Sequence, residues 1–325
     1  MHSPPPRGCS CSHSASDFNV VAAATSVLER LATIRSGRVQ IVSESVALSL
    51  SSLLSHSDGS VRSAAIAALR VASDSIESRR TLAGYDDVAK LMTQSLCALN
   101  PVDGAFCCCP ILSATFSNHG HFVSAAPLST FSFALDICAS HLHPTLSAAS
   151  ETGIQTVQAL TNMVKEDRAT SVAITAGLMP MICKLLVAYN PTSSLTPHGN
   201  YFLESLLVLL QNVSAWSAAK LALVSAGVIP ALLPCLEASQ QPDIQRIACS
   251  ALALILVCIP GKQAAQPLCG PLVTLLSCAS QRELYVNAKQ ALKSACEEAK
   301  FRATCAAMLR ASVPDELEDI TCGRA

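Results

Sequence analysis

The residues best suited to chemistry are thiols and imidazoles gathered between positions 107 and 143. The group consists of Cys107, Cys108, Cys109, His119, His121, Cys138, His141 and His143. Zinc needs four convergent ligands of these types, usually at CxxC or HxxxH spacing, and neither spacing occurs here. Because consecutive residues of a helix point about 100° apart, at most two of the three adjacent cysteines could face one ion. We expect buried cysteines and loop histidines, with no metal or cofactor; a metal-dependent or thiol enzyme centred on this cluster is the alternative.

A second group, Cys9, Cys11 and His13, forms a CxCxH pattern in a Pro-, Ser- and Cys-rich stretch. It could hold a metal only with ligands from elsewhere, and we expect residues 1–17 to be a disordered tail. The sequence contains no GxSxG elbow, no Walker loop and no paired-carboxylate motif beyond the acidic end at 314–319. The sequence therefore predicts a protein that is not an enzyme.

Composition restricts the partners. Half of the 325 residues are hydrophobic, only 14% are charged, and the formal net charge is −1, so the clustered Lys and Arg that nucleic acid requires are missing. The most apolar window, residues 247–260, is shorter than the roughly 18 residues that cross a bilayer. The first residues lack the apolar core of a secretory signal. We expect a cytoplasmic chain with reduced thiols, no membrane span and no nucleic-acid partner.

One short phrase recurs along the chain. TAGLMPMICKLL begins at Thr175 and SAGVIPALLPCL begins at Ser225. Glycines before similar apolar runs are Gly37, Gly84, Gly177, Gly227 and Gly270. The interval between Gly84 and Gly177 is 93 residues, and we interpret it as two periods, with Ala126 in the place of the missing glycine. About six units at 42–51 residues match the period of helical repeat arrays.

Most of these runs are followed by a polar turn and an Ala/Leu-rich segment. These segments begin near Ser57, Glu151, Gly199, Pro242 and Gln281. Their apolar residues recur at three- and four-residue steps, which predicts helices with a buried stripe. No unit could bury its stripe alone, so stability must come from stacking.

These phrases resemble the armadillo-repeat family. Gly177–Leu186 and Gly227–Leu236 match that family's second-helix pattern, while Ala159–Val164 and Leu209–Ser214 match its Asn-containing third helix. The resemblance implies an all-α, right-handed α-solenoid of about six degenerate armadillo/HEAT-like repeats. We place the solenoid at 18–310 and an acidic C-terminal tail at 311–325.

The resemblance also implies a peptide groove lined by the third helices. Its Asn falls on Asn162 and Asn212, where an amide could clamp a peptide backbone or, alternatively, tie its own helix end to the next turn. The equivalent positions in the other units are aligned as Arg70, Ala114, Ile255 and Ser294. The positions one turn earlier are Gln158 and Val208, and Trp216 lies one turn after the second Asn.

Departures from the family pattern narrow the role. Nuclear-import adaptors carry Trp one turn before each Asn, and Gln158 and Val208 stand there instead. A Lys- and Arg-lined groove for acidic partners is not evident, since the basic residues are dispersed and balanced by Glu204 and Glu283. We expect a non-enzymatic protein–protein interaction scaffold. Its degenerate repeats are similar to radial-spoke and central-apparatus proteins, which implies a structural component of a ciliary or flagellar axoneme with cytoskeletal partners; a soluble cytosolic adaptor that binds an extended peptide is the alternative.

Overall fold

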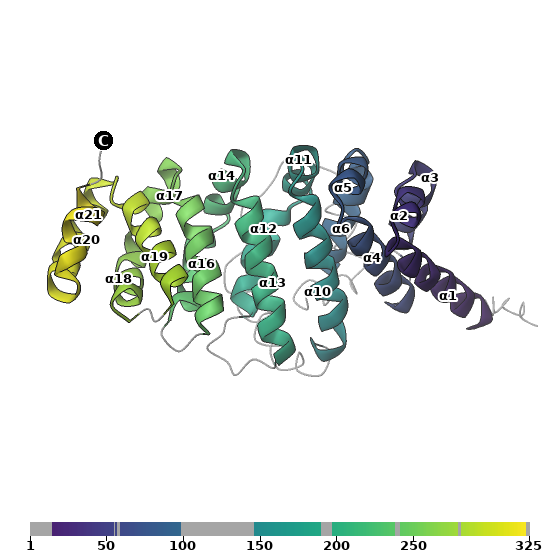
Figure 1. Ribbon diagram of the computed structural model, residues 1–325, viewed down its shortest axis with the longest axis horizontal. Coiled ribbons are helices and arrows are strands. Elements are labelled where there is room, and N and C mark those ends of the chain that lie inside the picture. The colour runs from purple at the N-terminus through teal and green to yellow at the C-terminus, as the bar shows by residue number, and fades with distance from the viewer. Residues whose placement is uncertain are drawn as a thin grey trace, which may run out of the picture.

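The computed structural model describes residues 15–54, 56, 59–98, 146–189, 197–237, 241–278 and 281–322. Several predictions lie outside these residues: the Cys107–His143 cluster, the Cys9, Cys11 and His13 group, and Ala114 and Ala126. Every regular element within the described residues is a helix. The predicted all-α solenoid is confirmed, because the helices form a single elongated row of layers (Figure 1).

Six long helices form one side of the row, each packed against the next along the chain (Figure 1). They are α1 (Ala15–Ala32), α4 (Gly59–Ala72), α10 (Leu146–Met163), α13 (Pro197–Val213), α16 (Pro242–Ile255) and α19 (Arg282–Ala295). We call them the third helices, since α4, α10, α13, α16 and α19 each close a three-helix repeat.

Two shorter helices precede each of these five closing helices. The first helices are α2 (Arg35–Ile41), α5 (Ile76–Ala83), α11 (Asp167–Thr175), α14 (Ser217–Ser225) and α17 (Ile259–Ala264). The second helices are α3 (Glu44–Leu53), α6 (Asp86–Ala98), α12 (Leu178–Ala188), α15 (Val228–Leu232) with the 3-10 segment η1 (Leu233–Leu236), and η2 (Gln266–Leu268) with α18 (Cys269–Cys278). The described residues thus contain five three-helix repeats between α1 and a C-terminal group, α20 (Ala299–Ser312), η3 (Pro314–Glu316) and α21 (Leu317–Thr321).

The recurrent glycine phrase forms the corner between a first and a second helix. Gly177 and Gly227 have φ of 89° and 83°, a left-handed conformation that glycine adopts without steric penalty. The chain bends by 72° at the first corner and by 84° at the second. Pro180 and Pro230 follow within the first helical turn, where a backbone N–H has no intrahelical acceptor to lose. Both phrases are therefore corners, as the sequence predicts.

Gly37 has a different role from the one its sequence context suggests. It lies inside the first helix α2, not at the start of a second helix. A Cβ on Gly37 would lie 2.0 Å from the carbonyl oxygen of Leu31, and a Cβ on Gly261 of α17 would lie 2.6 Å from that of Ile255. Glycine at this position lets a first helix approach the end of the preceding third helix closely, so Gly37 was the wrong landmark for a repeat.

The interpretation of the 93-residue interval as two stacked units is wrong. The third helix α4 packs directly on α10, and α6 packs on both α10 and α11. Since these adjacent layers are in direct contact, no further layer separates them. The segment between α6 and α10 is an insertion within one repeat, and the layer spacing in sequence is regular only outside it.

The core runs between the layers. Leu160, Leu210, Leu252 and Leu292 occupy equivalent positions on four third helices and are all fully buried. Truncating a buried leucine to alanine typically costs about 2–5 kcal/mol, through lost burial and the cavity left behind. Stability is therefore distributed over the interfaces between neighbouring repeats, as the stacking argument requires.

The sequence predicts that residues 311–325 form an acidic tail. Their described part, residues 311–322, packs against the last repeat. Helix α21 contacts α19 and α20, and Ile320 is only 1% exposed. Lys289 of α19 lies 2.6 Å from both Glu316 and Asp319, and Lys293 lies 2.7 Å from Asp319. At the N-terminus, α1 begins at Ala15, inside the stretch expected to be a tail up to residue 17.

No single helix in the described part of the chain is long and apolar enough to cross a membrane. Two bent pairs pass a test of length and composition together, α11 with α12 and α14 with the α15–η1 pair. These are the two glycine corners, and most of their apolar side chains are buried between layers.

Candidate functional site

The third helices α10, α13 and α16 carry the predicted groove residues. Equivalent positions on these helices can be found by counting back from the N-cap residue of the first helix that follows each of them. These N-cap residues are Glu166 for α11, Trp216 for α14 and Cys258 for α17. Four residues before these caps lie Asn162, Asn212 and Leu254.

This register corrects two of the sequence alignments. In α4 the cap is Ser75, so the equivalent of Asn162 is Val71, and Arg70 is one residue out of register. In α16 the equivalent is Leu254, because Ile255 is fully buried in the core. Both errors arise from Ala/Leu-rich helices that carry no Asn to mark the position. The alignment of Ser294 in α19 is correct, since the cap there is Glu298.

Asn162 is tied to the preceding repeat. Its Nδ2 donates to Asp74 Oδ1 at 2.9 Å and to Ser73 Oγ at 3.2 Å, and its Oδ1 accepts from Lys165 Nζ at 3.3 Å. Ser73 and Asp74 form the corner between α4 and α5. The amide of Asn162 therefore holds two layers together, which is the structural alternative considered for this residue.

Asn212 has the equivalent position but makes no recorded side-chain hydrogen bond to a described residue. The corner that faces it consists of Val164 and Lys165. Val164 has no side-chain acceptor, and its carbonyl already accepts from Trp216 Nε1 and from Thr170 Oγ1, both at 2.8 Å. Lys165 can only donate. The half-buried amide of Asn212 therefore finds no side-chain acceptor at this corner.

The other predicted groove residues are partly buried, and two of them bond to a neighbouring repeat. Gln158 Nε2 donates to the hydroxyl of Tyr201 on α13 at 3.0 Å, and Val208 is partly buried against the core. Trp216 caps α14, and its indole N–H bonds back to Val164, so it joins two repeats at their corner. Arg70 lies in the last turn of α4, and its Nε is buried without a hydrogen bond.

Apolar residues surround Asn212 on the neighbouring positions. We define the Asn212 patch as Val208, Asn212 and Ala215 of the α13 end together with Leu254 and Val257 of the α16 end. Helices α13 and α16 pack side by side, and Val257 is 56% exposed. The patch contains no charged residue. Sequence reasoning missed Leu254 and Val257 because only the capping register reveals which residue of α16 stands beside the Asn.

Charged groups on the same helices neutralise one another, as the sequence suggests. Arg246 of α16 lies 3.4 Å from Asp243 and 3.7 Å from Glu283 of α19, and Lys262 lies 2.5 Å from Glu297. Such partly exposed pairs contribute little to stability, but they leave no concentrated charge beside the Asn212 patch.

Cysteines in the described residues are mostly core residues. Burial raises the pKa of Cys183, Cys235 and Cys249 to about 12, so these thiols stay protonated at neutral pH. Within the described ranges, no group of three or more His, Cys, Asp or Glu side chains is placed to hold a metal ion.

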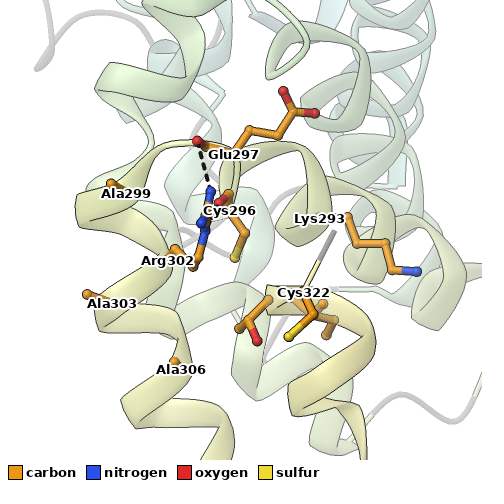
Figure 2. A pocket seen from close by; sticks show the side chains of 10 residues that line it. Lys293, Cys296, Glu297, Ala299, Arg302, Ala303, Ala306 and Cys322 are labelled. Atoms are coloured by element: carbon orange, nitrogen blue, oxygen red, sulfur yellow. Dashed lines mark hydrogen bonds between the residues drawn. The ribbon is translucent and has the colours of Figure 1, made fainter. Parts of the chain in front are cut away.

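A cavity of about 700 Å³ lies at the C-terminal end, between α19, α20 and α21 (Figure 2). Its walls include Cys296, Cys322, Lys293 and Arg302. The Arg302 side chain donates to the carbonyls of Cys296, at 2.6 Å from Nε, and of Glu297, at 3.3 Å from Nη2. The cavity belongs to the end of the row and is separate from the Asn212 patch.

Comparisons with known proteins agree with this architecture. Residues 217–257 match the armadillo/beta-catenin-like repeat family. Among solved structures, an engineered protein is 19% identical with a TM-score of 0.60, covering 87% of this chain and 93% of its own. A designed armadillo repeat protein is 16% identical with a TM-score of 0.57, covering 88% and 96%. Another, solved in complex with the peptide (KR)4, is 15% identical with a TM-score of 0.58, covering 86% and 95%.

No curated protein matches the sequence significantly. The family match covers α14 to the end of α16, which is one complete repeat containing the Gly227 corner and part of the Asn212 patch. The structural matches extend over most of the row and show the fold. This chain therefore contains an armadillo repeat and has the all-α solenoid fold of armadillo-repeat proteins.

Proposed function

We propose that the protein is a non-enzymatic scaffold that binds an extended segment of a partner protein across the Asn212 patch. The observation that carries the proposal is the contrast between two motif asparagines, one tied to Asp74 and Ser73 and one with its amide available. A free amide can donate to one peptide carbonyl and accept from one peptide N–H.

The surroundings of Asn212 define the chemistry of the bound segment. Val208, Leu254 and Val257 offer apolar contacts beside the amide, and none of the five patch residues is charged. Lys165, at the corner on the other side of Asn212, donates from Nζ to Asn162 Oδ1 at 3.3 Å. We expect a segment with small or medium apolar side chains flanking the clamped peptide unit. The designed armadillo protein solved with a (KR)4 peptide supports peptide binding by this fold, while the uncharged patch favours a different sequence.

A library of random linear peptides, selected for binding to the full chain, tests the proposal. Asn212→Ala should weaken binding of the selected peptides about tenfold, because it removes one or two hydrogen bonds that together contribute about 1.4 kcal/mol. The urea midpoint of the protein should stay unchanged. Leu221→Ala is the matched control, because Leu221 is 50% exposed on the first helix α14, outside the patch. Selected peptides that bind Asn212→Ala and wild type equally would contradict the assignment of the site.

The finer cellular role is a separate proposal. The axonemal assignment and a ciliary location rest on the sequence resemblance, whereas a cytoplasmic location rests on the lack of a secretory signal in the sequence given and on the expected reduced thiols. Co-fractionation with detergent-extracted axonemes tests the assignment, and recovery entirely in the soluble fraction would favour the adaptor role.

A further inference from the structure

Four cysteines converge at the C-terminal end of the row. They are Cys269 of α18, Cys296 at the end of α19, Cys305 of α20 and Cys322 just after α21. The Cys305 thiol lies close enough to those of Cys269 and Cys296 for both to influence its pKa. Neither the fold nor the Asn212 patch requires this arrangement.

Two of the four face the C-terminal cavity. Cys296 and Cys322 both line its wall, from the ends of α19 and α21 (Figure 2). Cys322 is exposed, whereas Cys296 is 3% exposed. Helix α21 has only five residues and Cys322 directly follows it as the C-cap, so a small adjustment of this segment can change the separation of the two sulfur atoms.

The inner thiols are poor nucleophiles. The hydrogen bond from Cys269 favours the Cys305 thiolate, but the contact with Cys296 and burial outweigh it and raise the pKa of Cys305 to about 12. The hydrogen bond to Cys305, followed by burial, raises the pKa of Cys269 as well. Because the thiolate is the attacking species, exchange should stop at Cys296 and not continue inward.

We propose that Cys296 and Cys322 form a redox latch that fastens the C-terminal segment to the last repeat. A low-molecular-weight disulfide supplies the oxidising equivalents. The Cys322 thiolate attacks one of its sulfur atoms, giving a mixed disulfide and releasing one thiol. The Cys296 thiolate then attacks Cys322 Sγ, forms the internal disulfide and expels the second thiol. Two protein thiols are oxidised, the reagent's disulfide is reduced to two thiols, and the protons pass to those products.

The latch acts on a cap that otherwise depends on ion pairs. On the third helices of the inner repeats, the position nine residues before the N-cap of the following first helix is buried and apolar. Val157, Leu207 and Cys249 occupy it. In α19 it is Lys289, whose partners are Glu316 and Asp319 of the C-terminal segment. Partly exposed ion pairs open readily, whereas a disulfide between the ends of α19 and α21 keeps α21 seated over the last layer.

Oxidised glutathione, added to the full-length folded protein, is the test reagent. After quenching by alkylation, non-reducing peptide mass spectrometry should find a Cys296–Cys322 cross-link in most molecules, and dithiothreitol should remove it. The amide of Ile320 should exchange at least tenfold more slowly in the oxidised protein. Cys322→Ser should abolish both effects, and its exposed position means that the variant will fold.

Cys258→Ser is the matched control, because Cys258 is a half-exposed thiol at the start of α17 that does not line the cavity. It should leave the cross-link intact. A stable glutathione adduct on Cys322 with Cys296 still reduced would overturn the proposal. A cross-link from Cys322 to Cys305 or Cys269 would also overturn it, because disulfide exchange would then have continued beyond Cys296.

Discussion

Replacing Asn162 by alanine tests whether the motif asparagines have different roles. The substitution removes a bond of 2.9 Å to the carboxylate of Asp74 and one of 3.2 Å to the hydroxyl of Ser73. A neutral hydrogen bond contributes about 0.5–1.5 kcal/mol and one to a charged group about 1.5–3, with the lower end appropriate to an exposed acceptor. We expect a loss of about 2 kcal/mol. With an m-value of about 3 kcal/mol/M, the urea midpoint should fall by roughly 0.7 M.

The assay is urea unfolding followed by circular dichroism, applied as a double-mutant cycle. Asn162→Ala and Asp74→Ala should couple by about 1 kcal/mol, because each removes one end of the same bond. Asn212→Ala serves as the comparison and should change stability by less than about 0.5 kcal/mol. If Asn162→Ala were as harmless as Asn212→Ala, and showed no coupling to Asp74→Ala, the assignment of Asn162 to a structural role would be refuted.

Two further predictions concern the corner and the cap. Gly177→Ala should lower the free energy of unfolding by roughly 1–2 kcal/mol because of the positive φ alone, since an added Cβ meets nothing within 4 Å. Gly177→Asn should lower it less, because Asn tolerates this conformation. Equal shifts of the urea midpoint for the two variants would contradict this explanation. Hydrogen bonds from Lys289, and then Lys293, lower the pKa of Asp319 from 3.8 to about 2. The part of the stabilisation of α21 that Asp319 contributes should therefore be complete above about pH 4 and be lost as the pH falls from 3.8 through 2. Asp319→Asn should remove that part and leave the part due to Glu316, whose pKa is also lowered by the hydrogen bond from Lys289; hydrogen exchange at Ile320, corrected for intrinsic rates, measures both.

The sequence was sufficient to predict the parts that depend on local chemistry. Gly177 and Gly227 were identified as corners because a glycine followed by an early proline has few other structural uses. The register of α4 and α16 was not predictable in the same way, since those helices are Ala- and Leu-rich on several faces and carry no marker residue. Only the residue that caps the next helix, such as Ser75 or Cys258, identifies the equivalent position.

The packed C-terminal segment did have a sequence signal. Lys289 stands at a position that is buried and apolar in the inner third helices, where Val157, Leu207 and Cys249 occupy it, and the acidic run 314–319 follows α19. Polar residues on a face that should receive the next layer indicate that no ordinary layer follows. The acidic run was expected to be solvated because its basic partners, about 26 to 30 residues earlier, lie on a separate helix.

The two asparagines show why a motif alone does not identify a functional residue. Asn162 and Asn212 have the same spacing to their helix ends, yet the corner of the preceding repeat decides what each amide does. Ser73 and Asp74 supply two acceptors for Asn162, whereas Val164 and Lys165 supply none to Asn212. In a solenoid each residue packs against the previous repeat, so the informative unit is the motif together with the corner one repeat earlier. The corner one repeat earlier thus distinguishes the asparagine that joins layers from the one that we propose binds a partner.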